Sequence, residues 1–253
     1  MHYDFCALTD PGRFRPNNED ACTFDRAAQL AVLADGMGGY NAGEVASTMA
    51  TLLVKEELAH RLLDKGPQDN LGQLYLAIEV SAALANRAIF QAARSNPLYA
   101  GMGTTLVVGV FQPTRLVLGH VGDSRCYRWR AQTLVQLTHD HSLVQEQVDA
   151  GLLTPAQAAT SPIRNLVTRA MGVEAAVRIE LHQHSVAPGD LYLMCSDGLT
   201  DMLETPAIAG ILDQGGSLQE LAQQLVDAAN AQGGRDNITV LLVSARAVTG
   251  GSV

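Results

Sequence analysis

The chain has 253 residues, of which 47% are hydrophobic and 17% charged, and its formal net charge is −9. This composition is typical of a globular protein that buries a sizeable core. The negative charge repels polyanions, and the only two lysines are Lys55 and Lys65. We therefore expect no nucleic-acid partner and no binding to an anionic membrane surface.

The cysteines and the N-terminus exclude further classes of protein. The four cysteines are widely spaced without a C-x-x-C pair, which disfavours a zinc cluster and a disulfide framework and is typical of a reducing cytoplasm. The first ten residues lack a basic region followed by an apolar core, and no apolar stretch of about 18 residues occurs. The sequence thus predicts a cytoplasmic monomer without a signal peptide or membrane span.

The first half of the chain alternates between the two kinds of secondary structure in blocks. An apolar run predicts a strand over 30–34, and helical periodicity follows over 43–63 and 71–94. Two further apolar runs, 104–111 and 115–121, are separated by the short turn QPT, which predicts an antiparallel hairpin.

The second half begins with a segment that interrupts the strands. Residues 138–172 contain a helix start at Asp140 or Ser142, a stop at Gly151, and a second start at Thr154 and Pro155. We expect this excursion to be either a connector or a mobile flap beside a site.

The chain then returns to apolar runs. Strands are predicted at 191–195 and 238–243, separated by a helix that Ser217 and Glu220 open as a capping box. Because strands and helices do not strictly alternate, the expected class is α+β, with layers and antiparallel pairing, formed as a single domain over 1–253.

Acidic residues recur where the predicted strands end. A lone Asp-Gly pair is usually a turn former, but here the arrangement repeats in Glu19 and Asp20, Asp35, Asp123, Asp197, and Asp236. Two carboxylates about 4 Å apart repel by about 4 kcal/mol at an effective dielectric constant of about 20. If these acids converge, they require a bound cation, and oxygen ligands favour Mg²⁺, Mn²⁺ or Ca²⁺ over zinc. The glycine after Asp35 lets the backbone approach such an ion.

Three other hydrolytic schemes fail on spacing. GDSRC, at 122–126, differs from the G-x-S-x-G nucleophile elbow at its last position, and no phosphate loop of the form G-x-x-x-x-G-K-[ST] occurs. A cysteine-based phosphatase needs an arginine six residues after its nucleophile, and none of the four cysteines has one.

Eight short motifs carry a resemblance to a known family. In order they are RPNNED, ADGMGG, GMGTTLVV, VGDSR, LTHDHS, TRAMG, LMCSDGLTD and GGRDNITV, spread over nearly the whole chain. Together they resemble the bacterial members of the metal-dependent protein Ser/Thr phosphatases, the PP2C or PPM family. The resemblance implies a four-layer α/β/β/α sandwich in which two antiparallel sheets are flanked by helix pairs, with the segment 138–172 as a flap.

The resemblance also implies a binuclear Mg²⁺ or Mn²⁺ centre that activates a bridging water for in-line attack on a phosphomonoester. The implied metal ligands are Asp35 between the two ions, the carbonyl of Gly36, Asp197 and Asp236. Asp123, together with Asp197, would hold a third and weaker ion.

Four more residues receive roles from the resemblance. Arg15 would bind the substrate phosphate, because a planar guanidinium can donate two parallel hydrogen bonds to phosphate oxygens. Glu19 and Asp20 would hold metal-bound waters, and Asn237 would steady Asp236. The implied substrates are proteins phosphorylated on serine or threonine, including a Ser/Thr kinase.

Two positions depart from the family pattern, so the sequence does not identify the general acid that protonates the leaving group. Tyr40 stands where many bacterial relatives have histidine, and His120 precedes VGDSR in place of asparagine. We assign none of His120, His139 and His141 to catalysis, since a lone histidine is more often structural. Two alternative functions also stay open: hydrolysis of small phosphate esters, and a catalytically inactive relative that only binds partners.

Overall fold

The computed structural model describes residues 1–39, 42–64 and 70–248. Within these residues the strands pair antiparallel in two sheets. The first sheet has the order β1-β11-β10-β7-β8. Its strands are β1 (His2–Asp10), β7 (Arg125–Arg130), β8 (Thr133–Gln136), β10 (Leu191–Cys195) and β11 (Ile238–Arg246).

The second sheet has the order β2-β3-β5-β6-β9, and the short strand β4 pairs with β3 beside this path. Its strands are β2 (Asp20–Asp25), β3 (Leu30–Met37), β4 (Gly103–Thr104), β5 (Leu106–Phe111), β6 (Arg115–Val121) and β9 (Glu180–Ser185).

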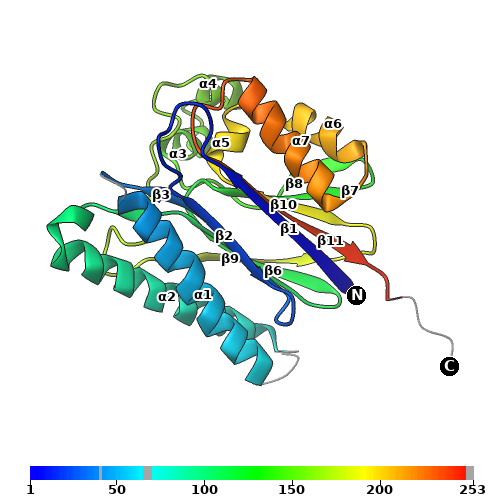
Figure 1. Ribbon diagram of the computed structural model, residues 1–253, viewed down its shortest axis with the longest axis horizontal. Helices are drawn as coiled ribbons and strands as arrows, with labels where there is room; N and C mark the ends of the chain where they lie inside the picture. Colours follow the sequence, from blue (N-terminus) through cyan, green and yellow to red (C-terminus); the bar gives the residue numbers. More distant parts are fainter. Residues whose placement is uncertain (40–41, 65–69, 249–253) are drawn as a thin grey trace.

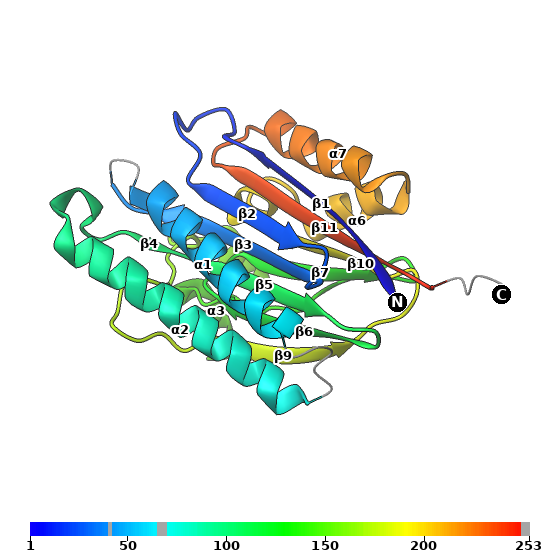
Figure 2. The ribbon, with the colours of Figure 1, turned by 60° about the horizontal axis from the view of Figure 1, so that its bottom comes forward.

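Helices cover the outer face of each sheet, as Figures 1 and 2 show. The long helices α1 and α2 lie over the second sheet, and α6 and α7 lie over the first. The helices are α1 (Ala42–Asp64), α2 (Leu71–Ser95), α3 (Leu143–Asp149), α4 (Pro155–Ala159), α5 (Asp197–Thr200), α6 (Thr205–Asp213), α7 (Leu218–Ala231) and the 3₁₀ turn η1 (Pro97–Tyr99). The predicted four-layer α/β/β/α sandwich is confirmed.

Three apolar clusters fill the spaces between the four layers. One lies under α1 and α2, one between the two sheets, and one under α6 and α7. The central strand β5 shows why its sequence is apolar throughout. Its alternate residues Leu106 and Val108 enter the helix-side cluster, whereas Val107 and Phe111 enter the cluster between the sheets. Both faces of the strand are buried, so the apolar run has no polar alternation.

The long helices follow the sequence prediction closely. The helix predicted over 43–63 is α1, and that over 71–94 is α2, with Asn70 as its N-cap. The predicted capping box forms at α7, where the Ser217 side chain accepts from the Glu220 backbone and the Glu220 side chain accepts from Ser217. Each helix also presents an apolar stripe to a sheet, which adds burial to the local capping signal.

Two strand predictions change in detail. β3 extends three residues beyond the predicted 30–34, so Asp35 lies inside the strand and not after it. The run 104–111 divides into β4 and β5 at Thr105, whose side-chain hydroxyl accepts the bond from the Asp35 amide. The predicted hairpin of β5 and β6 is confirmed, with Phe111 opposite Leu116.

The segment 138–172, which we call the flap segment, contains α3 and α4 and no strand of either sheet. Ser142 caps α3, and Thr154 with Gln157 forms a capping box on α4. An isolated bridge between Ser142 and Val167 ties the two ends of the segment together. In the described part of the chain, no helix is both long and apolar enough to span a membrane.

Candidate functional site

Asp20 and Asp35 face each other across two paired strands. β2 and β3 are antiparallel, and these two residues are directly opposite in the register. The backbone of Asp35 is fixed from the other side by Thr105, whose hydroxyl accepts from the Asp35 amide at 2.9 Å and whose amide donates to the Asp35 carbonyl at 2.9 Å. Both bonds hold Asp35 in one orientation beside Asp20.

Gly36 occupies a position with no room for a side chain. A Cβ there would lie 2.1 Å from the carbonyl oxygen of Gly43 and 2.5 Å from that of Glu19. The Gly36 amide donates to the Glu19 carbonyl at 3.1 Å. The first turn of α1 therefore packs directly on β3, and the Glu19 side chain lies against Gly43.

The acids of the first sheet arrive from two neighbouring strands. Asp197 follows β10 and opens α5, whereas Asp236 stands just before β11. Because β10 and β11 are antiparallel, the end of one and the start of the other share an edge of the sheet. Ser196 joins the two sheets there, since its hydroxyl donates to Asp20 Oδ2 at 2.7 Å.

Arg15 and Asn237 lie in the same corner. Arg15 Nη2 donates to Asp236 Oδ2 at 2.7 Å. The Asn237 amide group donates to the carbonyls of Pro11 and Asn17 at 3.0 and 2.8 Å, and its oxygen accepts from the Glu19 amide at 2.7 Å. Asn237 thus fixes the loop that carries Arg15, in addition to standing next to Asp236.

The electrostatics show that the predicted acids converge. Burial raises the pKa of Asp35 well above its usual value, and the charges of four other acids raise it further: Asp20, Asp197, Asp123 and Asp236. Burial likewise raises the pKa of Asp20 to about 6 and that of Asp123 to about 7. The structure therefore places five acids from both sheets and their loops at one shared edge of the sandwich.

This set of residues fits divalent cations that prefer oxygen. Asp20 Oδ1 is buried and has no hydrogen-bond partner among the residues that the structure describes. The converging side chains are carboxylates, so they offer the hard oxygen donors that suit Mg²⁺ or Mn²⁺. Their mutual repulsion is relieved when a cation binds among them.

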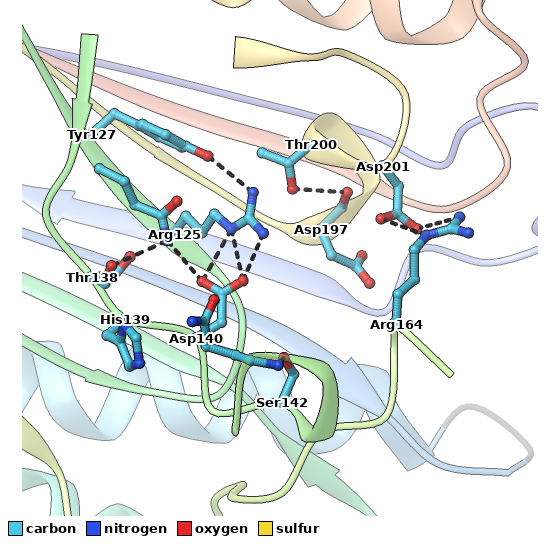
Figure 3. Close-up of polar contacts among 12 residues, drawn as sticks. Arg125, Tyr127, Thr138, His139, Asp140, Ser142, Arg164, Asp197, Thr200 and Asp201 are labelled. Carbon is cyan, nitrogen blue, oxygen red and sulfur yellow. Dashed lines mark hydrogen bonds and ion pairs between the residues drawn. The ribbon is translucent and has the colours of Figure 1, made fainter. Parts of the chain in front are cut away.

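Sequence reasoning missed several polar residues around the acids. Asp201 raises the pKa of Asp197 and itself accepts from Arg164 and Asn165 of the flap segment. Figure 3 shows Asp197 at the start of the short helix α5 and Asp201 directly after it, with Arg164 reaching Asp201. The four-residue spacing of the two aspartates was the available signal, because residues i and i+4 share a helix face.

A second ion pair ties the flap segment to the first residue of β7, two residues after Asp123. Arg125 donates to both carboxylate oxygens of Asp140 at 2.6 to 3.0 Å, and its remaining nitrogen donates to the Tyr127 hydroxyl (Figure 3). Asp140 is buried, and its charge raises the pKa of Asp123. The sequence showed both residues within motifs but not their pairing.

The other candidate groups lie outside the carboxylate cluster. His120 is buried against the rings of His141 and His182, and its Nε2 contacts the His139 carbonyl at 2.7 Å. Cys126 and Cys195 are buried, and burial raises the pKa of both thiols, which disfavours thiolate chemistry. Tyr40 lies outside the described residues.

Comparison with known proteins identifies the family. A family model described as protein phosphatase 2C matches residues 15–242. The chain belongs to the protein phosphatase 2C family. A serine/threonine phosphatase (stp) of Listeria welshimeri is 38% identical over 246 residues, covering 96% of this chain and 95% of the relative. The protein phosphatase PstP of Mycobacterium tuberculosis is 41% identical over 94% of this chain, which corresponds to 44% of that relative.

Solved structures of 2C phosphatases confirm the fold. The crystal structure of the M. tuberculosis phosphatase PstP superposes with a TM-score of 0.88 at 37% identity, covering 98% of this chain and 100% of that one. A second structure, of the PstP catalytic domain in complex with two manganese ions, has a TM-score of 0.84 at 37% identity and covers 97% of this chain and 99% of that one.

Proposed function

We propose that this 2C phosphatase is a metal-dependent serine/threonine protein phosphatase that uses Mg²⁺ or Mn²⁺. The observation that carries the proposal is the convergence of five acids, Asp20, Asp35, Asp123, Asp197 and Asp236, at one edge of the two sheets. The family membership and the two manganese ions of the PstP complex support it.

The proposed ligands divide between two tight ions and one weaker ion. Asp35, the Gly36 carbonyl, Asp197 and Asp236 would hold the tight pair, and Asp123 with Asp197 would hold the third. When bound, such a pair lowers the pKa of a shared water and neutralises charge on the transferring phosphoryl group. Glu19 and Asp20 would accept hydrogen bonds from water at the site.

Arg15 would bind the substrate phosphate. Its side chain is 53% exposed and therefore accessible to a phosphoprotein. It is paired with Asp236, whose carboxylate is one of the proposed metal ligands. A cation held by Asp236 would compete with Arg15 for this carboxylate, which would leave the planar guanidinium of Arg15 able to donate to phosphate oxygens.

The family membership supports a proposal for the setting in which the enzyme acts. We propose that the enzyme acts as a cytoplasmic monomer and that a Ser/Thr kinase is among its substrates, since opposing kinase and phosphatase activities share phosphorylated sites. All the proposed metal ligands are present in this chain. This disfavours the alternative of a catalytically inactive relative, because such a protein would lack at least one ligand.

Phosphate release from a peptide panel tests this function. Matched phosphoserine, phosphothreonine and phosphotyrosine peptides, with p-nitrophenyl phosphate as the small ester, are incubated with the chelated protein before and after Mn²⁺ is restored. We expect Mn²⁺-dependent release from the first two peptides. Release from the small ester alone would contradict a protein substrate, and absence of any release would indicate the inactive relative.

A further inference from the structure

His141 lies where the flap segment meets the loop between β6 and β7. It is buried, and its ring stacks on that of His120 with centroids 4.7 Å apart and an interplanar angle of 12°. Neither histidine is a proposed ligand of the metal centre. The contacts of His141 therefore call for a separate explanation.

His141 forms hydrogen bonds with both polar groups of the Gly122 backbone. The His141 amide donates to the Gly122 carbonyl at 2.9 Å, and the Gly122 amide donates to the ring Nδ1 at 3.1 Å. Gly122 has a φ of +99°, and a Cβ there would lie 2.6 Å from the Thr105 side chain. Gly122 directly precedes Asp123, so these two hydrogen bonds hold the backbone next to that carboxylate.

The contacts with Gly122 and Glu180 define one tautomer of the ring, whereas Arg169 Nη1, 3.0 Å from Nε2, could donate to Nε2 only in the other. A backbone amide can only donate, so Nδ1 must carry the lone pair and Nε2 the proton. The Nε2 proton then points to Glu180 Oε2 at 3.1 Å, and burial lowers the pKa of His141, which keeps the ring neutral. Glu180 on β9 thereby fixes both the tautomer and the orientation of the ring.

His120, His141 and Glu180 form a cluster that resembles a metal site, because one ligand atom of each lies within 4.8 Å of the others. The hydrogen bonds favour another role. Nδ1 of His141 already accepts from Gly122, and Nε2 donates to Glu180, so neither nitrogen offers a lone pair to an ion. The cationic guanidinium of Arg169 also lies 3.0 Å from Nε2, where it would repel a metal ion.

The backbone of His141 extends the connection to the far end of the flap segment. Its carbonyl accepts from the Thr168 amide at 2.8 Å, and its neighbour Ser142 bridges to Val167. His141 thus connects the loop that carries Asp123 with both ends of the flap segment.

We propose that His141 is a positioning residue for phosphoester hydrolysis, whose ring, oriented by Glu180, holds the Gly122 backbone so that Asp123 faces the carboxylate cluster. This proposal rests on the proposed function, in which Asp123 binds the weaker metal ion. Groups that orient metal ligands commonly contribute about 10- to 100-fold to metal affinity or activity.

Two substitutions separate the hydrogen bond from simple packing. His141→Phe keeps an aromatic ring for the stack on His120 but removes the acceptor for the Gly122 amide. His141→Asn places an amide oxygen near the position of Nδ1 and can accept that bond, at the cost of a smaller side chain. His182→Asn is the matched control, because His182 also contacts Glu180, at 2.7 Å, but does not bond Gly122.

The primary readouts are the Mn²⁺ concentration for half-maximal turnover and hydrogen–deuterium exchange of the Gly122 amide without metal. For His141→Phe we expect at least about tenfold more Mn²⁺ for half-maximal turnover and loss of Gly122 protection. His141→Asn and the control should stay within about threefold of the wild type, the range left when an equivalent hydrogen bond is retained.

Several outcomes would overturn the proposal. These are an unchanged Mn²⁺ requirement in His141→Phe, equal losses in the phenylalanine and asparagine variants, or one extra tightly bound Zn²⁺ in the wild type that Glu180→Gln abolishes. If His141→Phe does not fold, the ring ¹⁵N shifts of the wild type decide, because an Nδ1-protonated ring contradicts the proposal. Absence of phosphatase activity in the wild type would instead refute the proposed function, while the exchange and tautomer measurements would still test the positioning of Gly122.

Discussion

Protonation of individual carboxylates controls how this site accepts a cation. Asp20 and Asp123 have pKa values raised to about 6 and about 7, with burial as the largest cause. In the metal-free protein these acids therefore hold protons at a pH where ordinary aspartates are ionised. A divalent ion must displace those protons, so metal binding and proton release are linked.

This linkage predicts a pH-dependent stabilisation by Mn²⁺. An acid with a raised pKa stabilises the metal-free fold while it is protonated, and that contribution is lost as the pH rises through about 6 to 7. The metal gains affinity over the same range. The increase in Tm caused by a fixed Mn²⁺ concentration should therefore be larger at pH 7.5 than at pH 5.5. Thermal unfolding at both pH values measures this, and an equal or larger increase at pH 5.5 would refute competition with protons.

Arg15 offers a second test at the scale of one residue. Arg15→Ala removes a charged hydrogen-bond donor from the substrate phosphate, typically worth about 1.5 to 3 kcal/mol, so KM for a phosphopeptide should rise roughly tenfold or more. The Tm should change little because the ion pair with Asp236 is partly exposed. Arg13→Ala, two residues away on the same exposed turn, is the matched control. Steady-state kinetics in which both variants match the wild type would remove Arg15 from the site.

The elements of the sandwich bring the site residues together through close backbone contact. β3 and the first turn of α1 touch at Gly36 and Gly43, where added side chains would meet backbone or carboxylate atoms below 3 Å. Such an approach cannot relax without separating a strand from a helix. The packing of these two elements, and not only the acids they carry, therefore shapes the site.

Gly36→Ala should disrupt this contact. The added Cβ would lie 2.1 Å from the Gly43 carbonyl, so we expect destabilisation of about 3 kcal/mol or more together with weaker metal binding. Gly39→Ala is the matched control, since a Cβ there meets no atom of the described residues within 4 Å and should change the free energy of unfolding by no more than about 0.5 kcal/mol. Denaturant unfolding compares the two. Equal stability of both variants would show that the contact yields easily.

The sequence predicted the buried elements better than the exposed ones. β5 and β10 are apolar on both faces and were recognisable as continuous runs, whereas β9, with the sequence ELHQHS, is polar and partly exposed at the sheet edge. Strands such as β1 and β7 also carry charged residues that mask the alternation. Their pairing is stabilised by backbone bonds to neighbours distant in sequence, which local patterns do not reveal.

At the scale of the whole molecule, the site exists only because two sheets pack face to face. Asp20 and Asp35 come from one sheet, Asp197 and Asp236 from the edge of the other, and the Ser196 hydroxyl bonds across the seam. The recurrence of acids at strand ends raised the hypothesis that they converge, and the family resemblance implied their shared site. The supporting contacts of Thr105, Asp140 and Asp201 were not predictable, since they depend on how loops fold back over the sheets.

Calorimetric titration of Mn²⁺ into the metal-free protein at pH 7.5 tests the central claim that these converging acids form a two-metal centre. We predict two tightly bound ions per chain, with at least one tight site lost in Asp236→Asn and both weakened in Asp35→Asn, while circular dichroism confirms that each variant is folded. Absence of tight binding in the wild type, or two undiminished tight sites in folded Asp35→Asn, would contradict the account.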